Sequence, residues 1–314
     1  MKHLFIINPV AGGSKKQTEE TGRMINEFTK TLDDPSEVYI TKGPMDACKK
    51  ITEEAETGVT DLRVYACGGD GTLNECANGA ANRQNVAITH YPCGTGNDFL
   101  KTFGKENVAL FRDLEELSKG EVRKLDLIDC SGRYGINICS VGIDARIGTD
   151  VHKYSKIPII GGAGGYVVSL IVNVIKGVNQ RFRVTAGDIT IDKKITLACV
   201  CNGRFYGGGF NPVPDAIPDD GILDCLIVEP VSRLKVAQIV GHYAKGKYNE
   251  YPEIFNHIRC SCLEIERDRE FVVNIDGEAV YAKKIKFSII PKGINFIFPP
   301  GMKYIDASEK QTGE

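Results

Sequence analysis

The chain has 314 residues, of which 42% are hydrophobic and 25% are charged, and its formal net charge is −2. This composition is typical of a globular protein with enough residues for two domains, and it excludes a disordered chain, a collagen-like repeat and a coiled coil. The near balance of acidic and basic side chains argues against nucleic acid as a partner, because nucleic-acid-binding domains are usually basic.

Cysteine usage and hydropathy indicate the compartment. The eleven cysteines are odd in number and form no Cys-x-x-Cys pair, as expected of free thiols in a reducing cytoplasm. The first residues lack the apolar segment of a signal peptide, and no apolar run reaches the roughly 20 residues that a membrane helix needs. We therefore expect a soluble, cytoplasmic protein.

Residues 1–125 alternate between strand and helix patterns, which favours a parallel sheet covered by helices in an α/β domain. Short apolar runs predict strands, and apolar residues at helical spacing predict helices. The predicted strands are 4–7, 37–41, 61–67 and 86–91, and the predicted helices are 17–32, 46–56, a helix starting at Thr72, and 109–119.

Residues 126–314 are dominated by strand patterns separated by turn residues, which predicts an antiparallel β-sandwich domain. Helices near 164–176 and 234–244 interrupt these strands, and the extreme C-terminus is free to return to the first domain. The predicted strands are 125–130, 181–185, 195–202, 223–228, 260–266, 271–275, 279–290 and 294–298.

Three polar loops follow predicted strands of the first domain, beginning at Asn8, Gly68 and Gly94. Glycines let backbone N–H groups approach phosphate oxygens, and the helix expected at Thr72 would add the positive end of its dipole. The carboxyl ends of neighbouring parallel strands are where open α/β sheets bind ligands. The alternative for any single loop is an ordinary glycine-rich turn, with Thr72 as a helix cap.

Together with later motifs, these loops resemble the catalytic domain of the diacylglycerol kinase and sphingosine kinase superfamily, most closely the soluble bacterial lipid kinases. The resemblance runs in order through nearly the whole chain. The motifs that carry it are Asn8-Pro9 with Gly12, Gly68-Gly69-Asp70-Gly71-Thr72, Gly94-Thr95-Gly96-Asn97-Asp98, Asn137 with Gly142-Ile143-Asp144-Ala145, Asn202-Gly203, Gly207-Gly208-Gly209, Asp220-Gly221, Leu223-Asp224 and Asp276-Gly277-Glu278.

This resemblance implies an ATP- and Mg²⁺-dependent lipid kinase, with diacylglycerol as the favoured acceptor and phosphatidic acid as its product. Asp70 and Asp126 would organise the catalytic Mg²⁺. Glu278 would deprotonate the lipid hydroxyl across an interdomain cleft from Asp70, with Asp276 nearby. The residues that would form the ATP site are Asn8, Pro9, Gly12, Thr41, Gly68, Gly69, Asp70, Gly71, Thr72, Asn74, Gly94 and Thr95.

Two segments of the second domain keep an alternative interpretation. Asp276-Gly277 is also the usual dipeptide of a tight β-hairpin turn, and such a turn is compatible with presenting Glu278. In the resembled kinases an acidic loop holds a structural Mg²⁺, which here implies Asp220 with the carbonyls of Ile217 and Ile222. The alternative for that loop is a solvated acidic turn.

The residues leave the acceptor and the partners open. A kinase of a soluble substrate, as in NAD kinases, and an inactive nucleotide- or lipid-binding regulator are the alternatives to a lipid kinase. Residues 231–247 predict a helix with Leu234, Ala237, Val240 and Ala244 on one side and with basic residues such as Arg233 and Lys235. Transient membrane contact and simple packing explain that helix equally well. A second copy of the chain is a further candidate partner.

Overall fold

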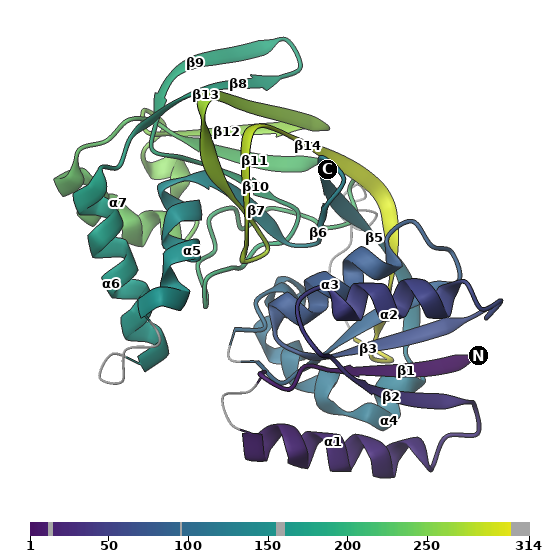
Figure 1. Ribbon diagram of the computed structural model, residues 1–314. Helices are drawn as coiled ribbons and strands as arrows, with labels where there is room; N and C mark the ends of the chain where they lie inside the picture. The colour runs from purple at the N-terminus through teal and green to yellow at the C-terminus, as the bar shows by residue number, and fades with distance from the viewer. Residues whose placement is uncertain (12–14, 95, 155–160, 303–314) are drawn as a thin grey trace. The chain divides into compact units, whose positions relative to one another are not determined.

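The computed structural model describes the chain except for residues 12–14, 95, 155–160 and 303–314 (Figure 1). The chain divides into two compact units. Unit 1 comprises Met1–Leu127, Pro218–Asp220 and the chain from Ile290 onward, and unit 2 comprises Ile128–Ile217 and Gly221–Ile289. The expected second domain, 126–314, therefore contains three stretches that belong to the first unit: residues 126–127, Pro218–Asp220 and the chain from Ile290 onward.

Unit 1 is built on a parallel sheet in the order β4-β3-β1-β2. Its strands are β1 (Lys2–Ile7), β2 (Ser36–Ile40), β3 (Leu62–Gly68) and β4 (Val86–Pro92), and β1, β3 and β4 are almost entirely buried. The helices between the strands are α1 (Lys15–Thr29), α2 (Asp46–Ala55) and α3 (Asp70–Ala80). The predicted α/β architecture is confirmed, with α3 beginning two residues before the expected Thr72.

The helix predicted over 109–119 is confirmed only in its second half. The structure has 3₁₀ segments at Phe99–Phe103 and Lys105–Arg112, followed by the short helix α4 (Leu114–Ser118). Asp113 separates the last two, because its side chain accepts the backbone N–H of Glu116 and so caps α4.

The end of the chain completes unit 1. The last part of β14 (Glu278–Phe298) lies parallel to β4, with Asn295 opposite Ala87. The side-chain amide of Asn295 donates to the carbonyl of Val86 at 3.0 Å, and the hydroxyl of Thr89 donates to the carbonyl of Ile297 at 2.8 Å. These contacts explain why the chain from Ile290 belongs to unit 1 despite its distance in sequence.

Unit 2 is an antiparallel sheet in the order β12-β11-β10-β7-β13-β14, with β8 paired to β13 and β9 to β8. The predicted antiparallel class is confirmed, although residues 260–266 and 271–275 form one strand with a bulge between Glu266 and Phe271. Strand β5 (Glu121–Cys130) passes from unit 1 into unit 2. The strands that follow are β6 (Tyr134–Gly135), β7 (Ile138–Gly142), β8 (Gln180–Ala186), β9 (Ile189–Ile195), β10 (Leu197–Cys201), β11 (Leu223–Val228), β12 (Phe255–Cys260) and β13 (Cys262–Ile275).

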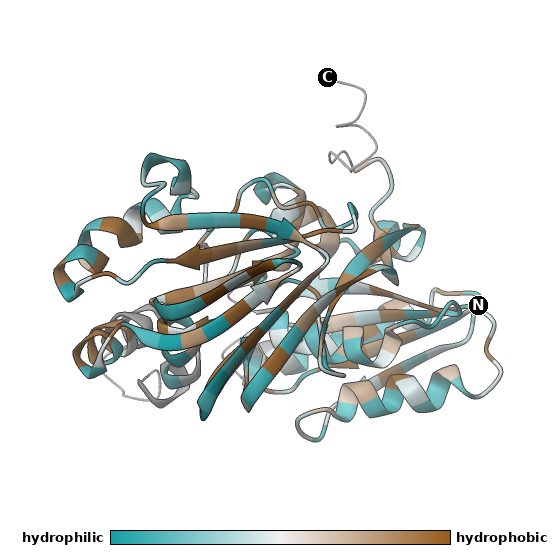
Figure 2. Ribbon diagram, turned by 90° about the horizontal axis from the view of Figure 1, so that it is seen from above, coloured by the Kyte–Doolittle hydropathy of each residue, from teal (hydrophilic) through white to brown (hydrophobic). Residues whose placement is uncertain are grey.

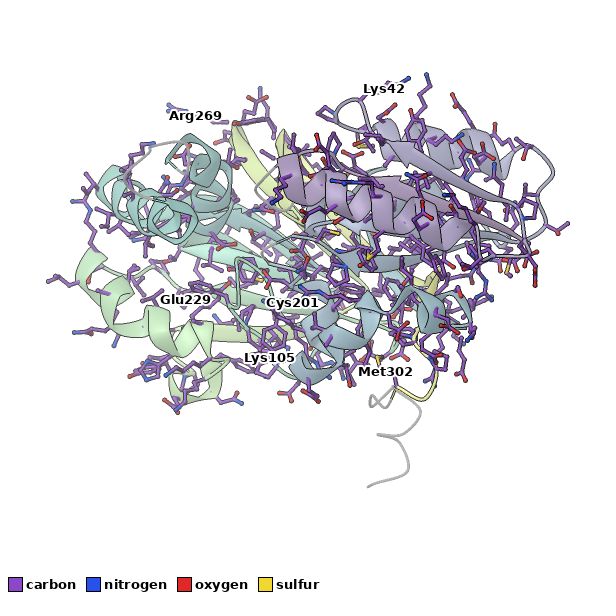
Figure 3. The ribbon with its side chains drawn as sticks, turned by 90° about the horizontal axis from the view of Figure 1, so that it is seen from below. Lys42, Lys105, Cys201, Glu229, Arg269 and Met302 are labelled. Atoms are coloured by element: carbon purple, nitrogen blue, oxygen red, sulfur yellow. The ribbon has the colours of Figure 1, made fainter. Side chains whose placement is uncertain are left out.

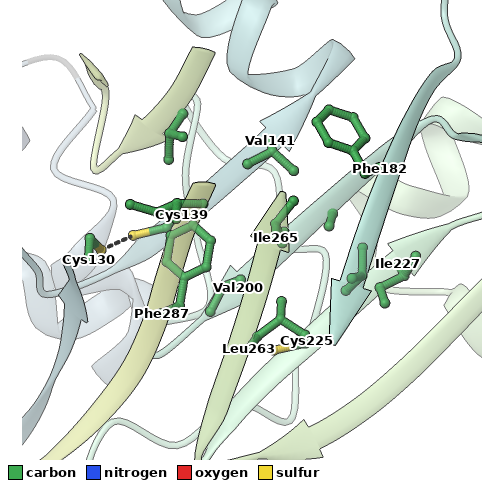
Figure 4. Close-up of a cluster of buried hydrophobic side chains, with 14 of the residues drawn as sticks. Cys130, Cys139, Val141, Phe182, Val200, Cys225, Ile227, Leu263, Ile265 and Phe287 are labelled. Atoms are coloured by element: carbon green, nitrogen blue, oxygen red, sulfur yellow. Dashed lines mark hydrogen bonds between the residues drawn. The ribbon is translucent and has the colours of Figure 1, made fainter. Parts of the chain in front are cut away.

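Two hydrophobic clusters stabilise unit 2. One lies within the sheet and contains Phe182, Phe287 and the neighbouring thiols of Cys130 and Cys139 (Figure 4). The other joins the sheet to α5 (Ile143–Tyr154), α6 (Gly161–Lys176) and α7 (Arg233–Ala244). Charged side chains such as Arg269 are exposed, whereas Cys201 is buried (Figure 3). All eleven cysteines are free thiols, as predicted.

No helix in the described part of the chain is long and apolar enough to cross a membrane.

Candidate functional site

The predicted phosphate loops meet at one edge of the sheet in unit 1, because β1, β3 and β4 are parallel neighbours. The side-chain amide of Asn8 donates to the hydroxyl of Thr72 at 3.0 Å. The backbone N–H of Gly94 donates to the carbonyl of Gly68 at 3.1 Å. The backbone N–H of Thr41 donates to the carbonyl of Ile7, the last residue of β1, at 2.9 Å. Residues from four separate chain segments therefore form one site.

Glycine is required where two of these loops touch. A Cβ atom added to Gly94 would lie 2.6 Å from the Cα of Gly69, a distance at which the backbones would have to separate. Gly69 also caps α3, whose first-turn N–H groups have no carbonyl partner within the helix. The close approach of the loops thus leaves a helix N-terminus suited to phosphate.

Asp70 stands at the beginning of α3 and is held by the third loop. Its Oδ1 accepts the backbone N–H of Asp98 at 2.7 Å and that of Phe99 at 3.4 Å. Burial raises the pKa of the Asp70 carboxyl, and these N–H donors and the nearby His90 partly oppose the shift. Burial also lowers the pKa of His90, whose Nε2 lies 3.0 Å from the Gly68 carbonyl oxygen.

Asp98 is a site residue that sequence reasoning did not single out. A Cβ on Gly96 would lie 2.8 Å from Oδ2 of Asp70 and 3.6 Å from Oδ2 of Asp98, so the two carboxylates share one side of the loop. Lys101 forms an ion pair with Asp98 at 2.5 Å. Paired carboxylate oxygens beside a phosphate loop fit Mg²⁺, which proteins commonly hold with one or two carboxylates and the phosphates of a substrate.

A small pocket that is partly open to solvent lies beside these loops in unit 1, between Asn8, Ala11, Thr18, Thr21 and Cys93. Pro9 is exposed near its rim, whereas Asn74 is fully buried in α3 and accepts the side-chain amide of Asn78 at 3.3 Å. Two residues of the predicted ATP site, Gly12 and Thr95, lie outside the described residues. ATP binding by the others stays a prediction.

Asp126 is fully buried in unit 1. Its Oδ1 accepts the backbone N–H of Lys292 at 2.7 Å, and its own backbone N–H donates to the carbonyl of Pro218 at 2.8 Å. Asp126 therefore joins the three chain segments that make up this unit. Its metal-organising role stays a prediction.

Asp276-Gly277 forms the predicted two-residue hairpin turn between β13 and β14, in which Ile275 pairs with Glu278. Both turn residues have positive φ, 50° at Asp276 and 99° at Gly277, as a type I′ turn requires. The turn leaves the Glu278 side chain exposed at the start of β14.

The carboxylate of Asp276 fastens this turn to the segment before β7. It accepts the backbone N–H groups of Ile136 at 2.7 Å, Asn137 at 3.1 Å and Ile138 at 2.9 Å. Three such donors occupy the carboxylate oxygens, which makes Asp276 a positioning residue for the hairpin that carries Glu278.

The predicted metal loop lies where the chain passes between the units. Asp220 belongs to unit 1, whereas Ile217 and Ile222 belong to unit 2. Ile217 is buried, and Asp220 is half-buried. Within the described residues, no three His, Cys, Asp or Glu side chains gather as a metal site. A structural Mg²⁺ in this loop stays a prediction.

Unit 2 contains an apolar cavity that the sequence did not predict, with about 500 Å³ of space that is partly open to solvent. Asp144 is its buried polar residue. The hydroxyl of Tyr206 donates to Oδ1 of Asp144 at 2.7 Å and lies 2.8 Å from the hydroxyl of Tyr243. The other carboxylate oxygen of Asp144, Oδ2, is buried without a hydrogen-bond partner among the described residues. The apolar lining includes Ile143, Ile147, Leu170, Leu197, Val236 and Ile239.

Two family models match consecutive parts of the chain. The diacylglycerol kinase catalytic domain matches residues 2–130, and the YegS C-terminal NAD kinase beta sandwich-like domain matches residues 137–298. The chain therefore belongs to the diacylglycerol kinase-type family that combines these two domains, and it is a kinase. The predicted family and the sandwich-like second domain are confirmed.

Individual relatives agree with this assignment. "Probable lipid kinase YegS-like" from Shewanella frigidimarina (strain NCIMB 400) is 30% identical over 283 residues, which cover 85% of this chain and 86% of the relative. A solved chain from Bacillus anthracis str. Sterne is 26% identical, with a TM-score of 0.74 over 96% of this chain and 98% of its own. Another solved chain from the same organism, described as a diacylglycerol kinase, is 24% identical and shares the fold with a TM-score of 0.68. The match covers 96% of this chain and 98% of the solved one.

Proposed function

We propose that this kinase transfers the γ-phosphoryl group of ATP to a lipid hydroxyl, with diacylglycerol as the favoured acceptor. The observation that carries the lipid class is the apolar cavity of unit 2, because its aliphatic lining is suited to the acyl chain of a lipid. The name of the Shewanella frigidimarina relative supports the same class.

In unit 1 the joined loops bind the nucleotide. The N-terminus of α3 and the N–H groups of the glycine loops attract the phosphates, since they present positive partial charge at close range. Asp70 and Asp98 would hold Mg²⁺, which when bound neutralises phosphate charge during phosphoryl transfer.

On the acceptor side, Glu278 is the proposed general base. The lipid oxygen forms a bond to the γ-phosphorus, the bond from that phosphorus to the β,γ-bridging oxygen breaks, and ADP leaves. The hydroxyl proton passes to the Glu278 carboxylate. Asp276 holds the hairpin that presents this carboxylate.

The test is transfer of labelled phosphate from ATP in the presence of Mg²⁺. The acceptors are diacylglycerol, monoacylglycerol, undecaprenol, a sphingoid base and phosphatidylglycerol in mixed micelles, and NAD in solution. We expect label in a lipid and most of it in phosphatidic acid. Label in NAD alone would establish a soluble acceptor, and no transfer at all would favour a regulator.

Glu278→Gln tests the base within the same assay. The amide keeps the size of the side chain but cannot take a proton, so kcat is expected to fall by about 10²–10⁴-fold with ATP affinity unchanged. Glu270→Gln, an exposed carboxylate on β13 of the same hairpin, is the matched control. Full turnover by Glu278→Gln would remove Glu278 from the mechanism.

A further inference from the structure

Helix α6 buries two polar residues on one face and exposes two isoleucines on the opposite face. Its polar residues are buried against α5, where the Ser169 hydroxyl donates to the carbonyl of Ile147 at 2.8 Å and the Asn173 amide donates to Asp150 at 3.1 Å. Ile171 and Ile175, one turn apart on the opposite face, are 53% and 65% exposed. A helix at a protein surface normally has the reverse arrangement, so this face is suited to an apolar medium.

The start of α7 extends this apolar face. Leu234 is 81% exposed, and its neighbour Arg233 donates from its guanidinium to the carbonyl of Ile175 at 2.8 Å, which places the start of α7 against the end of α6. We call Ile171, Ile175 and Leu234 the α6–α7 patch. The helices at the left edge of Figure 2 carry brown, hydrophobic residues among teal, hydrophilic ones.

The charged residues of the two helices that carry the patch are all basic. Neither α6 nor α7 contains an aspartate or a glutamate, whereas Lys176, Arg233 and Lys235 lie beside the patch along the chain. The carboxylate that pairs with Lys176 is that of Asp150, which is itself buried. Exposed aliphatic side chains with a basic rim complement a bilayer surface that carries anionic headgroups.

The same two helices form walls of the apolar cavity. Leu170 of α6 and Val236, Ile239 and Val240 of α7 line it, one helical face away from the patch. The α6–α7 patch therefore adjoins the cavity that is proposed to hold the lipid acceptor.

We propose that the α6–α7 patch is the surface by which this protein docks on an anionic lipid bilayer. The aliphatic side chains enter the boundary between headgroups and acyl chains, and the basic residues contact the headgroups. The purpose of this docking rests on the proposed function, because docking would bring the cavity to lipids in the membrane. The docking itself requires neither ATP nor catalysis.

The test is cosedimentation of the full chain, without ATP, with vesicles of phosphatidylcholine alone and of phosphatidylcholine mixed with phosphatidylglycerol. We expect binding to the mixed vesicles only, weakened by salt. The double variant Ile171→Ser/Ile175→Ser should lower the partition coefficient about tenfold or more, because each serine removes an aliphatic side chain from the bilayer. Ile189→Ser, at an isoleucine that is 52% exposed on β9, is the control and should bind as wild type does.

A charge variant separates the two contributions. Lys235→Glu, which keeps the contact between Arg233 and Ile175, should weaken the preference for phosphatidylglycerol while leaving the thermal transition of the protein in place. Equal vesicle binding by the wild type and the Ile171→Ser/Ile175→Ser variant would overturn the proposal. So would a wild-type dimer in solution that becomes a monomer in this variant, since a second copy would then cover the patch.

Because vesicle binding is measured without ATP, its outcome is independent of phosphate transfer. A chain that binds anionic vesicles but phosphorylates no lipid would contradict the proposed function alone. A chain that phosphorylates micellar lipid but ignores vesicles would contradict the docking surface alone.

Discussion

At the scale of single residues, Asp70 shows how a loop can place one carboxylate for phosphate chemistry. Its Oδ1 is held by the N–H groups of Asp98 and Phe99, and its Oδ2 lies on the side shared with the Asp98 carboxylate. The side chain is therefore oriented before any ligand arrives, which lowers the cost of assembling the site.

We expect Asp70→Asn to abolish phosphate transfer, because the amide removes the negative charge that would hold Mg²⁺. The unfolding temperature should change little, since the asparagine can still accept the two N–H groups. Asp33→Asn, at an exposed position of the same unit, should retain full activity. Normal turnover by Asp70→Asn, measured with labelled ATP, would exclude a metal role.

A second residue, Asp144, makes stability depend on pH. Burial raises the pKa of its carboxyl, and hydrogen bonds from Ser140 and Tyr206 partly oppose that shift. The folded protein thus holds this proton more tightly than the unfolded chain does. The resulting stability is present below the ordinary aspartate pKa and is lost as the pH rises through the raised pKa of the folded state.

Asp144→Asn should remove this dependence. At about pH 8 we expect the variant to resist urea better than wild type does, because the variant never bears the buried charge. This advantage should disappear at about pH 4, where the wild-type carboxyl keeps its proton. Asp268→Asn, an exposed position on β13, is the control. Parallel pH profiles for wild type and Asp144→Asn would show that the carboxyl does not titrate in this way.

At the scale of elements, one carboxylate fastens the turn of the β13–β14 hairpin to a distant part of the chain. Asp276 accepts three backbone N–H groups from residues 136–138, a segment more than a hundred residues earlier in the chain. The pairing of β13 with β7 holds the strand itself, and the Asp276 carboxylate adds a side-chain clamp at the turn, next to Glu278.

Asp276→Ala should therefore affect both stability and catalysis. Loss of the acceptor leaves partly buried N–H groups without a partner, and we expect a cost of about 1–3 kcal/mol in urea unfolding. The kcat should fall while ATP affinity is retained, because the phosphate loops belong to unit 1. Asp268→Ala on the same strand is the control, and a variant of wild-type stability and turnover would show that the clamp is dispensable.

At the scale of the whole molecule, the fold of unit 1 depends on the far end of the chain. Phe296 and Phe298 of β14 pack with Phe99, Phe103 and Phe111, with ring centroids 4.9 to 6.3 Å apart. The first 127 residues therefore lack part of their own hydrophobic core until the last strand arrives.

Phe296→Ala should destabilise unit 1 by about 3–5 kcal/mol, because the side chain is fully buried among these rings. Tyr281→Ala removes an aromatic ring from the same strand, where it is 61% exposed, and should change stability by less than about 1 kcal/mol. Denaturant unfolding of both variants compares the two costs directly. Equal losses would show that the last strand is not part of the core of unit 1.

The sequence by itself determined the features that depend on short-range chemistry. The alternation of apolar runs predicts the parallel and antiparallel parts of the fold, since strand and helix periods are local properties. Asp276-Gly277 predicts its hairpin because both positions must adopt positive φ. The glycine loops at Gly68 and Gly94 predict a phosphate site because glycines let backbone N–H groups approach phosphate oxygens, and the motifs around them identify the family.

Only the tertiary structure decided which residues from distant segments meet. It placed Asp98 beside Asp70, fastened Asp276 to residues 136–138, and returned Phe296 to the core of unit 1. It also buried Ser169 and Asn173 while leaving Ile171 and Ile175 exposed, an orientation that no apolar pattern within α6 specifies. The physical reason is that a side chain's energy in the fold depends on partners that lie far away in the chain, and local periodicity contains no information about them.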